Sequence, residues 1–214
     1  MKKLTSLIHI LFVILTLNSI TAQSKSEILL NEVSKKMAQF DNMYIKFNYV
    51  LENQEVDLKQ EVSGTVYTKG EKYNLEFMGN TFIYDTQNTY IILPEEEEIN
   101  IINGNSDEAM LNPSKLLFFY KKGFTYTWSN IKKINEKKIQ YIKLIPIDSD
   151  SETSYFILGI NVDSKIIHSI KEVGKNNTTT TFNIEEFHPN QNLSENLFIF
   201  DKAKFEQQQY TINR

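Results

Sequence analysis

The segment from Glu61 to Ile102 reads EVSGTVYTKGEKYNLEFMGNTFIYDTQNTYIILPEEEEINII, and the fold follows from it. Short runs rich in Val, Tyr, Phe, Ile and Thr alternate with turn-forming residues, which predicts an antiparallel meander with one buried face. The turns are expected at Gly70-Glu71, Gly79-Asn80, Gln87-Asn88 and Glu95 to Glu98. We expect one face to carry Tyr73, Leu75 and Phe77, and then the pairs Phe82 and Tyr84, Tyr90 and Ile92, and Ile99 and Ile101.

Further strands are expected on both sides of the meander. Met43 to Asn53 alternates between apolar and polar residues, as a half-buried strand does. Residues 55–67 continue the pattern, with a bulge or bend expected at Gly64. Later strands are expected at Phe124–Trp128, Ile139–Ile145, Tyr155–Val162, Ile166–Glu172, Thr178–Phe187 and Leu197–Phe200, before a polar tail from Lys202 to Arg214. The total is ten to eleven strands.

Two helices accompany the strands. The first is expected from Ser24, which forms a capping box with Glu27, to about Asp41, and it has one apolar face. The second is expected to begin at Asn112-Pro113 and to end at Gly123. A helix of two to three turns is unstable alone, so packing must hold it. The fold class is therefore mainly β with a few helices, in one domain over residues 23–214.

The first 22 residues have the order of a secretory signal peptide. Lys2-Lys3 precede an apolar run from Leu7 to Leu17, and Ala22 provides a small residue at the expected cleavage site. The apolar run is shorter than the roughly 20 residues that a membrane span needs. An uncleaved anchor helix is the alternative. With cleavage, the protein is expected to be soluble in the periplasm.

Charge and cysteine content exclude several classes of protein. The net charge is −4, and it becomes −6 without Lys2 and Lys3, so electrostatics give no reason to bind nucleic acid. The chain has no cysteine, which excludes disulfides, thiolate ligands and cysteine nucleophiles. The chain is long enough to rely on its own core, and we expect a monomer.

No catalytic or metal-binding motif emerges from the residues. His168 and His188, the histidines of the mature chain, have no metal-ligand neighbour at a recognised spacing. The acidic run Glu95 to Glu98 lacks the spacing of a calcium loop and is interpreted as a solvated hairpin. A carboxylate pair for glycoside cleavage stays open as an alternative. We therefore expect no enzyme, no cofactor and no metal.

The aromatic content is high, with 14 Phe and 11 Tyr against 7 Gly. Two interpretations stand equally on composition. These residues either fill a packed core or line an apolar cavity.

The order of the elements resembles the LolA family of periplasmic lipoprotein carriers, in its divergent Bacteroidetes form. The residues that carry the resemblance are Ile45-Lys46-Phe47, Gly64 to Tyr67, Lys72 to Phe77, Asn112-Pro113-Ser114, Gly123-Phe124, Leu158 to Asp163, Thr178 to Phe187 and the closing run Asn196 to Asp201. They cover nearly the whole mature chain. Each motif alone is weak, and their order and spacing are more specific.

The resemblance implies an unclosed antiparallel half-barrel covered by short helices, with an apolar cavity that binds acyl chains. Proteobacterial members of the family also carry an arginine that helps to hold the lid closed, and the matching position here is Asn74. Asparagine offers no charged, bidentate hydrogen-bonding group, so we do not expect this lid-locking interaction in this chain. The residues expected to line the cavity are Phe47, Tyr49, Leu51, Tyr73, Leu75, Phe77, Phe82 and Tyr84 from the sheet, and Leu116, Leu117 and Phe119 from the lid.

The implied partners are acylated lipoproteins, an inner-membrane ABC exporter and an outer-membrane acceptor. Covering the chains is physically necessary, because each exposed CH₂ costs roughly 0.8 kcal/mol in water. The alternatives are a protein of the same fold that binds another lipid or glycolipid, a sensor or scaffold that binds a protein, and a periplasmic hydrolase.

Overall fold

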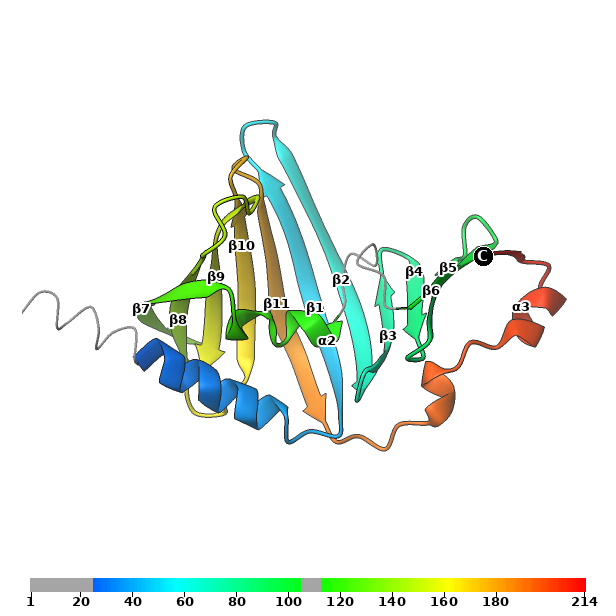
Figure 1. Cartoon of the computed structure of the whole chain (residues 1–214), viewed down its shortest axis with the longest axis horizontal. Coiled ribbons are helices and arrows are strands. Elements are labelled where there is room, and N and C mark those ends of the chain that lie inside the picture. Colours follow the sequence, from blue (N-terminus) through cyan, green and yellow to red (C-terminus); the bar gives the residue numbers. More distant parts are fainter. Residues whose placement is uncertain (1–24, 105–112) are drawn as a thin grey trace, which may run out of the picture.

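The computed structural model describes residues 25–104 and 113–214, and these form one open, mostly antiparallel sheet. The strand order is β12-β6-β5-β4-β3-β2-β1-β11-β10-β9-β8-β7, so the chain builds one half of the sheet, leaves it, and returns to build the other half beside β1 (Figure 1). Every pairing is antiparallel except that of β12 with β6. The mainly β half-barrel expected from the sequence is confirmed, with twelve strands instead of ten to eleven.

The strand bounds follow the expected pattern closely. The first half of the sheet consists of β1 (Asn42–Asn53), β2 (Leu58–Lys69), β3 (Lys72–Phe77), β4 (Asn80–Tyr84), β5 (Asn88–Leu93) and β6 (Glu98–Asn103). The second half consists of β7 (Phe124–Ile134), β8 (Lys137–Pro146), β9 (Thr153–Asn161), β10 (Ile167–Gly174) and β11 (Thr179–Pro189). The last strand, β12 (Thr211–Asn213), lies in the segment expected to be a polar tail.

The helices are short apart from the first. That helix covers residues 25–37, while its expected cap Ser24 and the expected signal peptide lie outside the described residues. The expected second helix is two separate turns, α2 (Pro113–Leu116) and the 3-10 helix η1 (Phe119–Lys121), and its expected cap Asn112 also lies outside the described residues. The others are η2 (Glu195–Phe198) and α3 (Lys202–Gln207). None of the described helices is long and apolar enough to cross a membrane.

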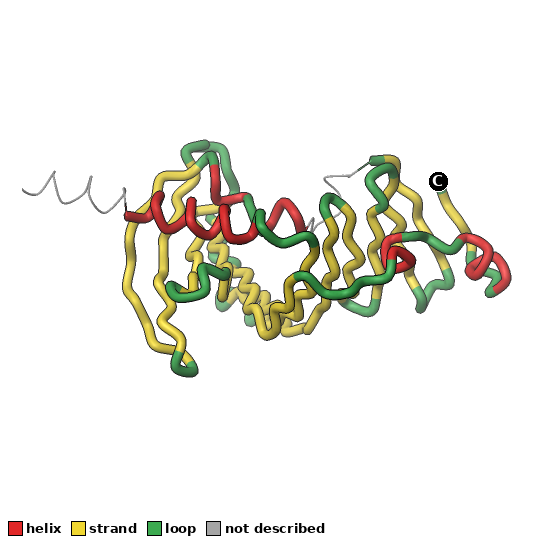
Figure 2. Tube along the Cα trace, turned by 90° about the horizontal axis from the view of Figure 1, so that it is seen from below, coloured by secondary structure: helices red, strands yellow, loops and turns green. Residues whose placement is uncertain are grey.

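The main core lies on the concave side of the sheet. Figure 2 shows the helix of residues 25–37 and α2 on this side of the curved sheet. The helix buries its apolar stripe there, with Val33 and Met37 at most 2% exposed. The opposite face of the helix stays in solvent, as its polar residues require. The two helical pieces therefore act as a partial cover over the trough of the sheet.

A bulge in β11 brings its aromatic residues onto the concave face. Lys46 of β1 opposes Glu186, whereas the next residue, Phe47, opposes Ile184, so β11 contains one extra residue at Glu185. Lys46 forms ion pairs with both Glu185 and Glu186 on the outer face, at 3.5 and 3.6 Å. The extra residue reverses the alternation, so that Ile184 and Phe187 can both pack against the main core.

Gly64 has a different role from the one expected. β2 pairs with β1 in unbroken register through Gly64, which lies opposite Phe47, so there is no bulge at this position. A Cβ at Gly64 would lie 2.5 Å from Cζ of Phe47. The glycine is therefore required because the far end of the Phe47 ring occupies the space that a Cβ would need.

The convex face of the meander holds a second hydrophobic cluster that the sequence reading assigned to the wrong side. Residues paired across neighbouring strands lie on the same face of the sheet. Tyr90 pairs with Ile83 and therefore lies on the convex face, whereas Tyr84 lies on the concave face. Ile83, Ile92 and Ile99 are buried on this face, opposite Tyr73, Leu75 and Phe77. The expected pairs Tyr90 and Ile92, and Ile99 and Ile101, are therefore on the convex face, where Phe200, Phe205, Tyr210 and Ile212 cover them.

The C-terminal segment, residues 194–214, forms the cover of this second cluster. The expected strand Leu197–Phe200 is instead the end of η2 followed by an extended link, and Ser194 caps η2 through its side chain. Phe200 stacks on Tyr90 with ring centroids 4.5 Å apart. The chain then continues through α3 to β12, which pairs in parallel with β6. This pairing occupies the edge of the sheet that β6 would otherwise expose.

Candidate functional site

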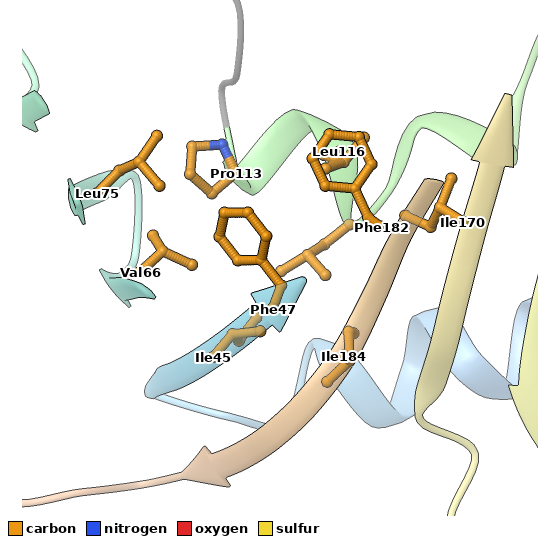
Figure 3. Close-up of a pocket in the computed structure, with 10 residues that line it drawn as sticks. Ile45, Phe47, Val66, Leu75, Pro113, Leu116, Ile170, Phe182 and Ile184 are labelled. Carbon is orange, nitrogen blue, oxygen red and sulfur yellow. The ribbon is translucent and has the colours of Figure 1, made fainter. Parts of the chain in front are cut away.

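An apolar cavity lies between the concave face of the sheet and α2 (Figure 3). Its lining comes from both halves of the sheet and from the lid: Ile45, Phe47, Val66, Leu75, Pro113, Leu116, Leu117, Ile170, Phe182 and Ile184. Every lining side chain is a hydrocarbon, so the cavity offers no hydrogen-bonding or charged group. A surface of this kind can bind only the apolar part of a ligand.

The cavity has a volume of about 50 Å³. Sites for small molecules typically measure roughly 300 to 1,000 Å³. The space between α2 and the sheet is therefore too small for a typical small-molecule ligand in this structure.

The structure places four of the expected site residues in the lining of this cavity: Phe47, Leu75, Leu116 and Leu117. Four others, Tyr49, Tyr73, Phe77 and Tyr84, are buried in the surrounding main core. The remaining three, Leu51, Phe82 and Phe119, are partly buried against that core. All eleven belong to the concave-side core that surrounds the cavity.

Six lining residues were not among those expected. Ile45 and Val66 are in the same strand phase as Phe47 and were recognisable from the alternation, and Pro113 begins α2. The other three, Ile170, Phe182 and Ile184, lie on β10 and β11. Only the pairing of β11 with β1, which sets Ile184 opposite Phe47, brings them to the cavity.

The two parts of the lid are attached differently. Tyr120 of η1 is fully buried, and its hydroxyl lies 3.2 Å from the Ser34 hydroxyl on the first helix. Tyr126 of β7 donates a hydrogen bond to the Tyr120 carbonyl at 2.8 Å. Burial raises the pKa of Tyr120, and the Ser34 hydrogen bond partly offsets this rise. η1 is thus linked to the first helix and to β7 by hydrogen bonds, whereas Leu116 at the end of α2 and Leu117 just after it face the apolar lining of the sheet.

Asn74 does not contact the lid. It pairs with Ile83 on the convex face, and its side-chain amide donates to the Leu197 carbonyl at 2.7 Å. Because α2 lies on the concave side, Asn74 does not face it, in agreement with the expectation that this position does not lock the lid. Asn74 instead attaches the C-terminal segment to the sheet, together with the ion pairs of Glu195 with Lys69 and Lys72.

Ionisable groups lie away from the cavity. Within residues 25–104 and 113–214, no group of three or more His, Asp and Glu side chains could hold a metal ion. Glu95 to Glu97 lie in the turn between β5 and β6 and are exposed. Partial burial lowers the pKa of His168, and the nearby Lys137 lowers it further. His188 stacks on Tyr44, with centroids 5.8 Å apart, on the outer face.

An open half-barrel whose concave face holds an apolar cavity beneath short helices defines a class of binding folds. The sequence matches the family model described as "Outer membrane lipoprotein carrier protein LolA" over residues 38–201. The chain therefore belongs to the LolA family. None of the curated proteins compared matches the chain.

Solved structures agree with this fold at low sequence identity. An uncharacterized conserved protein from Thermus thermophilus superposes with a TM-score of 0.56 at 12% identity, covering 89% of this chain and 99% of the other. A putative outer membrane lipoprotein-sorting protein domain from Vibrio parahaemolyticus has a TM-score of 0.48 at 11% identity, covering 86% and 99%. The lipoprotein LppX from Mycobacterium tuberculosis has 0.49 at 9% identity, covering 80% and 98%.

Proposed function

We propose that this protein is a periplasmic carrier that covers the acyl chains of lipoproteins and moves them from the inner to the outer membrane. The observation that carries the proposal is the hydrocarbon-only lining of the cavity beneath α2. Membership of the LolA family supports it. An acyl chain needs such a surface, because it gains about 0.8 kcal/mol for each CH₂ that leaves water.

Loading requires α2 to move, and the attachment of the lid allows it. α2 is a single turn, which has little stability of its own. Lifting it breaks apolar contacts of Leu116 and Leu117 with the trough, and an acyl chain that takes their place restores the same kind of contact. η1 keeps its link to the first helix through Tyr120 and Ser34. Opening and closing are therefore nearly balanced in free energy, as reversible loading demands.

The proposal extends to the route of the cargo. Residues 1–22 act as a cleaved export signal, the mature chain works as a monomer in the periplasm, an inner-membrane ABC exporter loads it, and an outer-membrane acceptor unloads it. Depletion in the host should then leave lipoproteins at the inner membrane. Intact lipoprotein sorting after depletion would favour a protein of this fold that binds another lipid or a protein partner.

The binding step is tested by placing a carboxylate in the cavity. Phe47→Glu and Leu116→Glu should each lower uptake of a purified triacylated lipoprotein, and of a fluorescent fatty acid, more than tenfold, because an ionised carboxylate in an apolar site repels the chain. The matched control is Ile199→Glu, which adds the same charge at a residue 56% exposed on the C-terminal segment. Circular dichroism confirms that each variant is folded. Unchanged uptake in folded cavity variants would refute the assignment.

A further inference from the structure

The end of the β7–β8 hairpin carries a concentrated positive charge. Residues 131–138, here called the hairpin tip, read IKKINEKK and contain four lysines and one glutamate, in a chain whose net charge is −4. All four lysines are exposed: Lys132, Lys133, Lys137 and Lys138. None of them forms an ion pair with another residue that the structure describes. Their charge is therefore available to a partner.

A tight turn holds these lysines close together. Asn135 and Glu136 are the two residues of the turn, with φ values of 44° and 66°, as a hairpin turn of type I′ requires. Lys133 and Lys138 are direct cross-strand partners. Like charges in that arrangement repel each other, so this pair does not serve the stability of the hairpin. An anionic partner would remove the repulsion.

Acidic groups beside the hairpin tip balance only part of its charge. Glu136 is exposed in the turn itself. Asp163 follows Val162, whose backbone N–H donates to the Lys138 carbonyl at 3.0 Å. Four lysines against these two carboxylates leave an excess of two positive charges. The local charge is therefore opposite in sign to that of the whole chain.

A bulge in β7 turns an isoleucine towards solvent beside the lysines. Trp128 opposes Ile142 and Ile131 opposes Gln140, so β7 contains one extra residue between the two pairs. The Gln140 side chain is buried, and its amide nitrogen donates to two backbone carbonyls of the bulge, at 2.8 and 3.3 Å. The bulge is thus held by a buried polar side chain. It is a fixed part of the fold.

The bulge decides which face the isoleucine shares. Residues two apart on a strand lie on one face, and so do cross-strand partners. Ile131, Lys133 and Lys138 therefore lie on the same face of the hairpin. Ile131 is 55% exposed there. β7 is the last strand at one end of the described sheet, so no further strand covers its outer edge (Figure 1). The hairpin tip thus presents lysines and one large apolar side chain together.

We propose that the hairpin tip docks this protein on membranes that contain anionic phospholipids. Lysine ammonium groups are attracted to the phosphates of an anionic surface, and an exposed isoleucine gains by entering the boundary between headgroups and acyl chains. A nucleic acid would engage the lysines and leave Ile131 in water. The inference concerns where the protein docks, and it does not depend on which cargo the cavity takes.

The test is sedimentation of the mature protein with large vesicles of phosphatidylcholine, either pure or with about 30% phosphatidylglycerol. The partition coefficient should be at least about tenfold higher for the anionic vesicles, and it should fall as salt is added. Lys133→Gln combined with Lys138→Gln should lower it about tenfold to thirtyfold, because both charges face the surface. Ile131→Ser should lower it about threefold to tenfold.

The matched control combines Lys59→Gln with Lys175→Gln. It removes the same charge from exposed lysines on β2 and on the turn after β10. The control should keep the partition coefficient of the wild type within about twofold, and circular dichroism checks the fold of every variant.

Three results would overturn the proposal while leaving the carrier function untouched. The first is equal binding of the wild type to both kinds of vesicle. The second is an equal loss of binding in the control and in the hairpin variants. The third is unchanged vesicle binding by Ile131→Ser together with lysine-dependent binding of a short single-stranded DNA, which would assign the hairpin tip to a soluble polyanion.

Discussion

Replacing Gly64 by alanine should destabilise the protein, because the Phe47 ring occupies the space that the new Cβ needs. The Cβ would lie 2.5 Å from Cζ and 2.9 Å from Cε2 of that ring. Carbon atoms prefer a separation of about 3.5 to 4.0 Å, so the ring must move by roughly 1 Å. Phe77 and Phe182 restrict this movement, with ring centroids 5.8 and 5.9 Å from that of Phe47.

Two opposing effects set the size of the stability change caused by Gly64→Ala. Overpacking of a well-filled core costs about 1 to 3 kcal/mol. The backbone at Gly64 is ordinary extended strand, so alanine also removes chain entropy from the unfolded state, which contributes about 0.4 to 1 kcal/mol of stability. The net expectation is a loss of about 0.5 to 2 kcal/mol. For a chain of this size, each kcal/mol lowers Tm by about 2 to 4 °C.

The assay is chemical denaturation of the wild type, Gly64→Ala, Phe47→Leu and the double variant. Leucine lacks the ring atoms that approach Gly64, so the double variant should lose less stability than the sum of the two single losses, by about 0.5 to 2 kcal/mol. Ser63→Ala, on the outer face of the same strand, should change stability by no more than about 0.5 kcal/mol. Strict additivity, or a Gly64→Ala protein more stable than the wild type, would refute the reasoning.

Two further predictions concern the C-terminal segment and His168. Phe200→Ala should lower the free energy of unfolding by about 1.5 to 3 kcal/mol in urea denaturation, because the stack on Tyr90 is lost, and an unchanged value would show that the C-terminal segment contributes nothing to stability. The depressed pKa of His168, caused by partial burial and by Lys137, means that the unfolded state binds the proton first as pH falls. Stability should therefore decline as pH falls below about 6.5, the ordinary histidine value, and His168→Gln should reduce this decline between pH 7 and pH 5 in thermal melts, whereas His188→Gln should not. An equal decline in both variants would assign the effect to other groups.

In the proposed function, the small cavity and the short α2 would let one chain both cover and release a lipid. A deeper permanent cavity would leave apolar surface in water in the empty state. Leu116 and Leu117, which line the cavity here, would give way to the cargo. The replacement would conserve apolar contact, which would keep the free-energy difference between the empty and the loaded state small.

Strand alternation was sufficient to predict which side chains of β1 to β3 face the concave side. Phe47 and Leu75 lie between polar neighbours, and Tyr49 and Phe77 follow them at the two-residue spacing of a strand. Their common face could therefore be predicted without any tertiary information. The alternation becomes ambiguous in β4 to β6, where both faces are apolar. Tyr90 and Ile92 could therefore lie on either face. A shift of one residue along the strand moves every side chain to the opposite face.

The amino-acid sequence alone determined the class of fold and the approximate positions of β1 to β11, because these depend on local alternation and turn chemistry. The tertiary structure decided what depends on long-range pairing. The bulge at Glu185 and the register of β11 against β1 bring Ile184 to Phe47, although these residues are far apart in the chain. The folding of residues 194–214 onto the convex face buried a second cluster there and gave Asn74 a role in holding that segment. Neither effect can be recognised from neighbouring residues in the sequence, because the partner of a strand or of the C-terminal segment is set by the folded sheet.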